Sequence, residues 1–418
     1  MHNAHQTSDS FGSSSGVASR RRWLRDTGIG FGSLALSTLL AEDSCASVLA
    51  PHGTHHAARA KRVIFLFMQG GQSQMDLFDP KPELRGRDGE PRNKKEPDGA
   101  QFKGSPFAFL RHGQSGLEMS EILPQLGARA DDLCLIRSMH TDTANHSNAM
   151  LAIHTGAQNF VRPSIGSWVV YGLGVESRSL PGFISIRPTR GHGSRVYSNA
   201  FLPAICQGVP LGNDGIRARH LSVPNLTNTK WNPSQQQQLM SFTNMLNERY
   251  AQRVGTDPAM DGLIQNYERA FRMQTEASRL FHLSDEPQHV LHMYGVGQPH
   301  TDDAARMCLL SRRFAEAGVR CVQVNHAGWD HHSNINQGIR QTCRRIDQPF
   351  AALLADLRQR GMLDDTLIVS TGEFGRTSTG EGTGPKAGRN HNAQGFTAWM
   401  AGGGARGGHA HGSTDPLG

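Results

Sequence analysis

Lys61–Gly71, with the sequence KRVIFLFMQGG, carries the strongest structural signal in the chain. Its apolar run over 63–68 has no polar interruption, which is typical of a central parallel strand that is covered on both faces. Gln69, Gly70 and Gly71 follow at the carboxyl end of this strand, the edge of an α/β sheet at which ligands bind. The segment therefore predicts an α/β domain with a candidate site at that edge.

Further apolar runs follow along the chain and alternate with segments of helical spacing. Strands are expected over 133–139, 183–187, 319–324, 366–370 and 396–401. Helices are expected over 120–130, after 140, over 235–253, 262–279 and 304–317, and over 339–360, where Pro349 introduces a kink. Alternation of this kind predicts a layered α/β fold with a mostly parallel sheet. Residues 61–418 form the expected domain, and residues 179–300 an insertion that is partly helical.

The composition limits the class of protein. In 418 residues, 37% hydrophobic and 19% charged residues exclude both a disordered tail and a membrane bundle. The 47 glycines lack a G-X-Y period, so they indicate tight turns and not collagen. The net charge of +7 invites a nucleic-acid partner, but +3 of it lies in residues 1–62. No nucleic-acid partner is therefore expected.

The N-terminal charge belongs to a segment that looks like a twin-arginine export signal. Ser19–Leu24 reads SRRRWL, with Arg20 and Arg21 as the twin arginines, and an apolar run over 27–41 follows. Fifteen residues are too few to cross a bilayer of about 30 Å, so no stable membrane anchor is predicted. Residues 1–47 are expected to be the signal and 48–60 a linker, with export by the twin-arginine (Tat) translocase to the periplasm or the exterior. The alternative is an ordinary basic helix.

Loops rich in histidine and carboxylate follow the predicted strands. The residues in these loops that carry chemistry are Ser73, Asp76, His140, His146, Ser147, Asp330, His331, His332, Glu373, Arg376, Arg389 and His391. If the strands are parallel, the loops meet at one edge of the sheet. The six cysteines show no C-x-x-C spacing, which argues against a zinc ribbon, an iron–sulfur cluster or a thioredoxin motif.

Histidine and carboxylate together are ligands for a divalent metal ion such as Zn, Mn, Mg or Ca. Two close metals would suit hydrolysis of a phosphate or sulfate ester, and Arg376 and Arg389 could hold the anionic group. Structural interpretations remain open beside this one. Glu373 could form a structural ion pair, and His140 could satisfy a buried carbonyl.

Other catalytic motifs are weak. Gly402, Gly404 and Gly407 match G-x-G-x-x-G after a strand, but no helix follows to bind a phosphate. G-x-S-x-G occurs only at 12–16, ahead of the twin arginines, where no strand precedes it.

The ordered motifs resemble a known family. LIRSMHTDTANHSNAMLAIHTG, GVRCVQVNHAGWDHHSNI, TGEFGRT and GRNHNAQGF closely resemble the exported bacterial family called domain of unknown function 1501 (DUF1501), which is abundant in planctomycetes and often labelled sulfatase. The resemblance covers essentially the whole chain. It implies the three-layer alkaline phosphatase-like fold of phosphatases, sulfatases and phosphomutases. It also implies a longer chain, so the C-terminus is expected to be truncated relative to the family.

The resemblance assigns roles only in part. Gln69-Gly70 stands where the superfamily has an Asp, so Asp76 or Asp79 would substitute for it. His146 stands where a sulfatase carries its modified Cys, which disfavours a formylglycine enzyme. Glu373 aligns with the Asp of Asp-His-Gly, whose His is lost. Asp330 with His331 or His332 resembles the Asp…His pair, and His391 resembles the last His.

These observations together give one candidate site. The metal ligands are expected to be Asp330, His331, His332, Glu373, His391 and Asp76; the catalytic residues His146, Ser147 and Arg376; and the substrate-binding residues His140, Ser73 and Arg389. The expected function is an exported metal-dependent hydrolase of phosphate or sulfate esters of a small molecule or polysaccharide. The alternative is a degenerate member that binds without turnover. A third hypothesis is a cofactor-carrying oxidoreductase, but the sequence contains no convincing cofactor motif.

Overall fold

The computed structural model describes residues 58–95, 99–177, 179–222, 230–255, 264, 268, 271–272 and 279–418. All of them belong to one compact unit, Pro51–Gly418. The predicted export signal, most of the linker and most of the helix expected over 262–279 lie outside the described residues. Within the described part of the chain, no helix combines the length and the apolar character needed to span a membrane.

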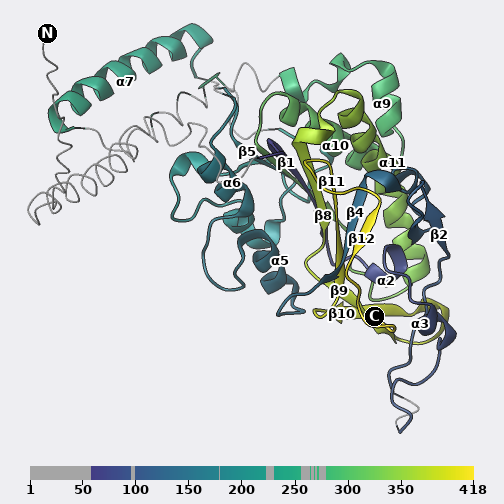
Figure 1. Ribbon diagram of the computed structural model, residues 1–418. Coiled ribbons are helices and arrows are strands. Elements are labelled where there is room, and N and C mark those ends of the chain that lie inside the picture. Colours follow the sequence, from purple (N-terminus) through teal and green to yellow (C-terminus); the bar gives the residue numbers. More distant parts are fainter. Residues whose placement is uncertain are drawn as a thin grey trace, which may run out of the picture. The chain divides into compact units, whose positions relative to one another are not determined.

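The centre of this unit is a sheet with the strand order β12-β4-β11-β8-β1-β7-β5-β6 (Figure 1). Its strands are β1 (Arg62–Gln69), β4 (Leu133–Met139), β5 (Phe183–Ile186), β6 (Val209–Leu211), β7 (Cys321–Ala327), β8 (Thr366–Thr371), β11 (Phe396–Ala401) and β12 (His409–His411). The predicted β1 lies in the middle and pairs in parallel with both β7 and β8. Because β11 alone of these strands runs antiparallel, the sheet is mostly parallel, and the predicted α/β fold is confirmed.

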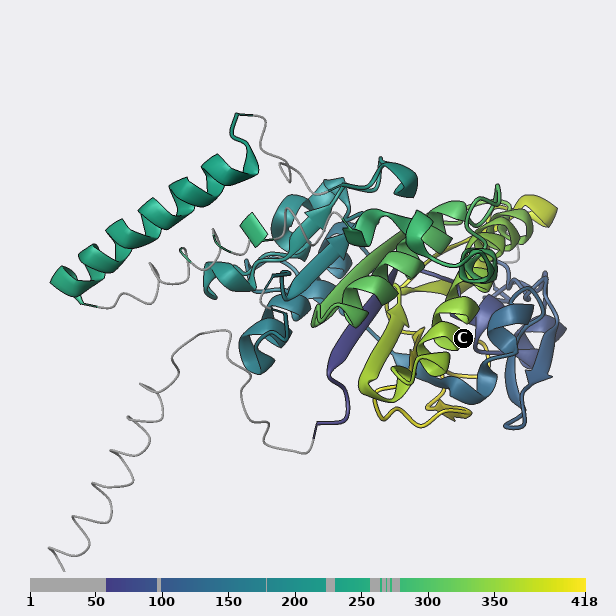
Figure 2. The ribbon, with the colours of Figure 1, turned by 90° about the horizontal axis from the view of Figure 1, so that it is seen from above.

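Both faces of the sheet are covered, as the uninterrupted apolar run in β1 predicts. Ile64, Leu66 and Met68 lie in the core cluster with α10 (Asp302–Glu316) and α11 (Ile335–Gln359). Phe65 and Phe67 point the other way and pack on Met150 of α5 (His146–Thr155). Figure 1 shows α5 and α6 (Ile165–Leu173) on one face and α10 and α11 on the other, and Figure 2 shows the same layers from above.

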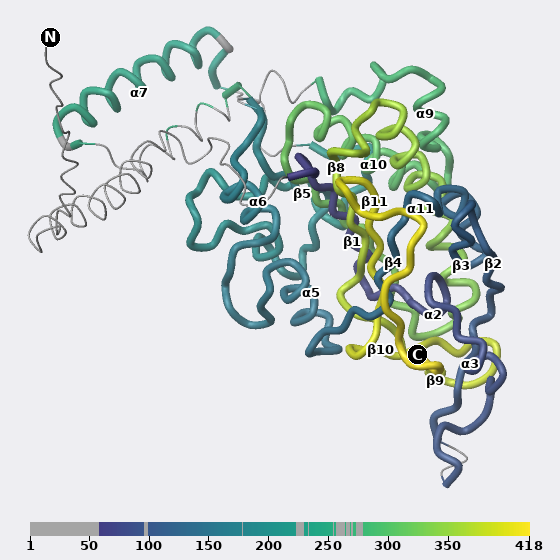
Figure 3. Tube along the Cα trace, in the orientation of Figure 1, coloured from purple at the N-terminus to yellow at the C-terminus, as the bar shows by residue number. Residues whose placement is uncertain are grey.

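The remaining elements are short or lie at the margins of the sheet. They are α2 (Gln74–Leu77), α3 (Pro82–Gly86), β2 (Phe109–His112), β3 (Leu117–Ser120), α4 (Pro124–Gly127), α7 (Pro233–Val254), α9 (Gln288–Tyr294), β9 (Gly375–Glu381) and β10 (Gly388–Asn392). Of the helix predicted over 120–130, only α4 is α-helical. Ser120 is the last residue of β3, and Ala130 begins a short 3-10 helix. Within the range predicted as an insertion, β5 and β6 add strands to the main sheet. In Figure 3 the C-terminal segment lies beside α2 and α3, where Thr414 donates a hydrogen bond to Asp79.

The direction of β11 matters for the site. A loop that precedes a parallel strand would lie at the amino edge of the sheet, away from the loops that follow the other strands. Since β11 runs antiparallel, the hairpin β9–β10 that precedes it lies at the carboxyl edge of β1, β7 and β8. The antiparallel strand therefore brings His391 of β10 to the edge where the other predicted loops meet.

Candidate metal centre

Four of the predicted site residues converge at the carboxyl edge of the sheet. His146, Asp330, His332 and His391 each offer one ligand atom, and these atoms all lie within 4.8 Å of one another. They come from the first turn of α5, the loop between β7 and α11, and β10. The cluster unites three segments that are far apart in the sequence.

Asp330 lies at the centre of the cluster. Its Oδ1 is 2.9 Å from His332 Nε2 and 3.2 Å from His391 Nε2, and its Oδ2 is 3.2 Å from His146 Nε2. His332 Nε2 and His391 Nε2 are 2.9 Å apart. A tetrahedral zinc shell with bonds of about 2.0–2.2 Å separates its ligand atoms by roughly 3.3 Å. The four separations of 2.9–3.2 Å are close to this spacing, and no two ligand atoms of the cluster are more than 4.8 Å apart.

The other ring nitrogen of each histidine is already bound to the protein. Nδ1 of His146 contacts Glu373 Oε1 at 2.7 Å, and Nδ1 of His332 contacts Glu381 Oε2 at 2.5 Å. Nδ1 of His391 is 2.8 Å from the carbonyl oxygen of Ala144. In the neutral imidazole that a metal ion requires, a ring whose Nδ1 donates to such an acceptor presents the lone pair of Nε2 to the cluster.

This arrangement fits a bound cation. With both rings in their neutral, metal-binding form, the Nε2 lone pairs of His332 and His391 would face each other at 2.9 Å and repel, and a carboxylate lies beside them. A divalent cation among the four atoms removes that repulsion, and three imidazoles with one carboxylate are a ligand set that zinc and manganese accept. The histidine side chains are 17–38% exposed and that of Asp330 is 43% exposed. The centre is therefore partly open to solvent.

Backbone geometry places Asp330 in the cluster. Gly70 follows β1 with a φ of +115°, and a Cβ atom on it would lie 2.6 Å from the amide nitrogen of Asp330. Only glycine fits there without displacing the loop. Asn145 plays the corresponding part for His146, because its side chain caps α5 by accepting the amide hydrogens of Ser147 and Asn148.

Asp330 and Glu373 accept hydrogen bonds from different kinds of donor. Burial raises the pKa of Asp330, but hydrogen bonds from His146, His391 and Arg376 outweigh it and hold that pKa far below its usual range. Glu373 is buried and accepts the amide hydrogens of Gly70 and Gly71. Burial lowers the pKa of His146, yet the hydrogen bonds and charges of Asp330 and Glu373 outweigh burial and raise it to about 9. In the absence of metal, His146 therefore carries a proton at neutral pH.

Arg376 lies behind the cluster and not on its open side. It is 1% exposed, and it donates to the carbonyl oxygens of Gly70, Gly71 and Arg389 as well as to Asp330 Oδ1. All three of its guanidinium nitrogens already contact protein acceptors. In this structure Arg376 positions Asp330.

A second group of predicted residues lies buried and apart from the cluster. Arg389 donates to both carboxylate oxygens of Asp76, at 2.8 and 3.1 Å, and both side chains are completely buried. Ser73 donates to Asp76 Oδ2 at 2.5 Å. The structure thus places a predicted metal ligand, Asp76, in a buried ion pair with Arg389 and in a hydrogen bond with Ser73, both of them predicted substrate-binding residues.

Three further predicted residues do not contribute ligand atoms to the cluster. His331 points toward α11, with Nε2 3.4 Å from Thr342 Oγ1, and burial together with the charge of Arg376 lowers its pKa to about 4. His140 is exposed at the end of β4. Ser147 is exposed on α5, and no hydrogen bond joins its hydroxyl to a described residue.

Sequence reasoning missed the acceptors that orient the histidines. Glu381 and the carbonyl oxygen of Ala144 hold His332 and His391, respectively. Ala144 acts through its backbone, so its residue type carries no signal. Glu381 ends β9, and only the β9–β10 pairing and the bridge between Ser333 and Ala387 bring it to the β7 loop.

The family follows from a comparison with family models. The model described as Protein of unknown function (DUF1501) matches residues 60–418. The chain belongs to this family. A comparison of this DUF1501 protein with curated protein sequences gives no match.

Solved structures similar to this DUF1501 protein include alkaline phosphatases and sulfatases. Alkaline phosphatase from the Antarctic bacterium TAB5 is 10% identical, with 84% of this chain and 95% of that chain covered and a TM-score of 0.35. The PsFucS1 sulfatase from Pseudoalteromonas sp. is 12% identical, with 86% and 66% covered and a TM-score of 0.34. The lipoteichoic acid synthase LtaP from Listeria monocytogenes is 9% identical, with 88% and 71% covered and a TM-score of 0.33.

Proposed function

We propose that this DUF1501 protein is an exported, divalent-metal-dependent hydrolase of phosphate or sulfate esters. One observation carries the proposal: three imidazole Nε2 atoms and a carboxylate converge at a solvent-open sheet edge, and a protein acceptor orients each imidazole. Orienting acceptors of this kind accompany the histidine ligands of metal sites. A divalent metal ion at this edge can stabilise charge on the oxygens of a phosphate or sulfate ester, which supports the proposed substrate class.

The four cluster residues would hold the ion, which supplies charge for the ester oxygens and lowers the pKa of a bound water. Glu373 keeps the proton of His146 on Nδ1 and so leaves Nε2 free for the site. Arg376 fixes one oxygen of Asp330, which determines where the carboxylate points. With Arg376 and Arg389 both bound to protein acceptors, the ester group relies on the metal centre for its charge partner.

Metal content and turnover test the proposal together. Purified protein should carry about one Zn or Mn ion per chain, should lose it to a chelator, and should hydrolyse an aryl phosphate or aryl sulfate only after metal is restored. His332→Ala and His391→Ala should each lose the metal and the activity. The matched control is His289→Ala, an exposed histidine on α9 that lies outside the cluster. Turnover that is unchanged by chelation and by both cluster variants would contradict the proposal.

A second candidate function is a binding protein without turnover. The observation that favours it is that Ser147, whose hydroxyl is the nearest to His146 in the chain, is exposed and has no hydrogen bond to a described residue. A hydroxyl that does not contact a base is not activated as a nucleophile. The same experiment separates the two functions. A folded protein that binds metal but leaves both aryl esters intact supports the binding protein.

Export is the cellular part of the proposal and depends on Arg20 and Arg21. Replacement of both by lysine preserves the charge but removes the twin-arginine motif. The variant should accumulate in the cytoplasm, whereas the unchanged protein should be found outside it. Equal export of the two proteins would argue against this route.

A further inference from the structure

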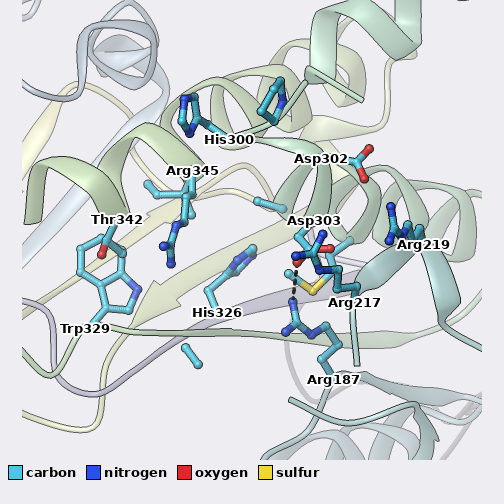
Figure 4. Close-up of a pocket in the computed structure, with 15 residues that line it drawn as sticks. Arg187, Arg217, Arg219, His300, Asp302, Asp303, His326, Trp329, Thr342 and Arg345 are labelled. Carbon is cyan, nitrogen blue, oxygen red and sulfur yellow. Dashed lines mark ion pairs between the residues drawn. The ribbon is translucent and has the colours of Figure 1, made fainter. Parts of the chain in front are cut away.

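A polar cavity of about 380 Å³ is lined by Trp329, the residue that precedes Asp330 of the metal centre (Figure 4). It opens at the carboxyl ends of β5 and β7, between α10 and α11. Its polar lining includes Arg187, Arg217, Arg219, Arg345, His326 and Trp329. In Figure 4 the ring of His326 lies near the centre, with the arginines around it.

The cavity is positively charged. Four arginines line it against two acids, Asp302 and Asp303, which leaves a net charge of +2 with histidine neutral. Both acids already have partners: Asp302 accepts from Arg306 Nε at 2.8 Å and from an amide, and Asp303 accepts from the amide of Ala218 at 2.9 Å. Of the four arginines, only Arg187 is paired with one of these acids, at 3.6 Å from Asp303.

The other arginines are not neutralised. Arg217 and Arg345 are exposed, and neither forms an ion pair with a described residue. Arg219 contacts only His220 Nε2 among the described side chains. Unpaired guanidinium groups that share one cavity repel each other, so a bound anion would remove a cost that the free protein carries.

Buried polar nitrogen atoms without partners among the described residues also lie at this cavity. His326 Nε2 and Trp329 Nε1 are buried, and neither has a hydrogen-bond partner among the described residues. His326 is 5% exposed and Trp329 1% exposed. The indole nitrogen can only donate, and a buried donor without an acceptor costs free energy. A ligand that supplies acceptor oxygens would satisfy the indole of Trp329, and also His326 in the tautomer that carries its hydrogen on Nε2.

Backbone strain occurs at the same place. Arg187 has a φ of +53°, one of three non-glycine residues with positive φ in the described part of the chain. Its guanidinium is held by the carbonyl oxygen of Asp214 at 3.0 Å, and its Nε has no partner among the described residues. Strained residues of this kind cluster at ligand-binding sites, where the surrounding structure holds them in place.

The cavity and the metal centre share one loop. Trp329 lines the cavity, and the next residue, Asp330, is the central ligand of the cluster. Consecutive Cα atoms are about 3.8 Å apart. Two consecutive residues of this loop thus contribute one to the cavity and one to the cluster.

We propose that the arginine cavity binds a phosphate- or sulfate-type oxyanion, and that this oxyanion is a second anionic group on the molecule whose ester lies at the metal centre. The substrate would then be a polyanion, such as a multiply sulfated or phosphorylated saccharide. The second part rests on the proposed hydrolase function, whereas the first part does not.

Calorimetric titration with inorganic sulfate and phosphate, at constant ionic strength with chloride as the reference anion, tests the first part. Arg217→Gln combined with Arg345→Gln should weaken binding by about tenfold or more, because two charge-assisted donors are lost. Arg344→Gln is the matched control, since Arg344 is an exposed neighbour on α11 that does not line the cavity. The proposal is overturned if neither anion binds the unchanged protein, or if the double variant binds as the control does.

Singly and doubly sulfated forms of one disaccharide separate a substrate group from a free ion. The doubly sulfated form should bind about tenfold more tightly, and the Arg217/Arg345 variant should abolish this difference. Equal binding of the two disaccharides, with inorganic sulfate still lost in the double variant, overturns the polyanion part. His332→Ala with His391→Ala should leave sulfate binding intact, so failure of the metal proposal remains distinguishable from failure of this one.

Discussion

Glu373 shows how much of the metal centre depends on one residue that does not belong to the ligand cluster. Its two oxygens accept the amide hydrogens of Gly70 and Gly71 and contact Nδ1 of His146. Glu373→Gln keeps the size but replaces one acceptor oxygen with an NH₂ donor. We expect metal affinity to fall by about 10–100-fold, as it does when an orienting partner is lost. Competition with a metal-binding indicator measures the change.

Glu381→Gln is the matched comparison, because Glu381 orients His332 in the same way but from a side chain that is 43% exposed. Water can replace an exposed acceptor, so the loss should be less than about tenfold. Equal affinity in the Glu373 variant and the unchanged protein would show that Glu373 does not orient His146.

His154 predicts part of the acid sensitivity of the fold. It is 2% exposed, Nδ1 donates to the carbonyl of Met150 at 2.7 Å, and Nε2 has no partner among the described residues. Burial lowers its pKa to about 4 from an unperturbed value of 6.5. As the pH falls, His154 therefore takes up a proton in the unfolded chain before it does so in the folded protein. The contribution of the neutral, buried His154 to stability is complete above pH 6.5 and is lost between about pH 6.5 and 4.

His154→Leu should reduce the loss of unfolding free energy over that range by about 2–3 kcal/mol. Denaturant unfolding at a series of pH values measures it. His289→Leu on the exposed face of α9 is the control and should leave the profile unchanged. Identical pH profiles for His154→Leu and the unchanged protein would exclude His154 as the source.

At the scale of elements, the turn after β1 connects the sheet to the metal centre. Gly70→Ala would place a Cβ 2.6 Å from the amide nitrogen of Asp330, at a φ of +115°. We expect a loss of about 1–3 kcal/mol of unfolding free energy, together with weaker metal binding, because the Asp330 loop must move. Denaturant unfolding and metal titration of the same variant measure both.

Gly86→Ala provides the matched glycine substitution, because a Cβ atom added to Gly86 would have no neighbour within 4 Å and the residue ends a helix. This change should be neutral or stabilise by up to about 1 kcal/mol. If Gly70→Ala behaved in the same way, the close approach of the turn after β1 to the Asp330 loop would not contribute to the unfolding free energy.

The elements also show why part of the fold was predictable. The uninterrupted apolar run over 63–68 predicted β1, because a strand buried on both faces needs apolar residues on both. Segments rich in apolar residues predicted β4 and β11 at their observed bounds. The direction of β11 was not predictable, since its short apolar sequence is compatible with parallel and with antiparallel pairing. Its antiparallel course places His391 at the site.

The same limit applies to the site residues. The triplet Asp330-His331-His332 predicted a ligand cluster, but its spacing does not tell which histidine faces the metal centre. The backbone turn after Trp329 decides it, directing His332 to the cluster and His331 toward Thr342. Asp76 and Arg389 carry site-like residue types, yet their complete burial as a pair follows only from the packing of α2 on β9 and β10.

At the scale of the whole molecule, metal binding and folding are linked, because the ligands come from residues 146, 330, 332 and 391. An unfolded chain cannot hold these atoms within 4.8 Å, so the ion binds only the folded state. At a free metal concentration of about 100 times Kd, the unfolding free energy should rise by about 2.7 kcal/mol. Thermal unfolding with and without metal should show a Tm increase of a few degrees.

The His332→Ala, His391→Ala double variant turns this linkage into a test of where the metal binds. Without two of its four ligands, the variant should show no metal-dependent increase in Tm at the same ion concentration. Its Tm in chelator should remain close to that of the unchanged protein, because both histidines are partly exposed. A metal-dependent increase of equal size in both proteins would place the stabilising ion elsewhere in the molecule, and the cluster would then not be the metal centre.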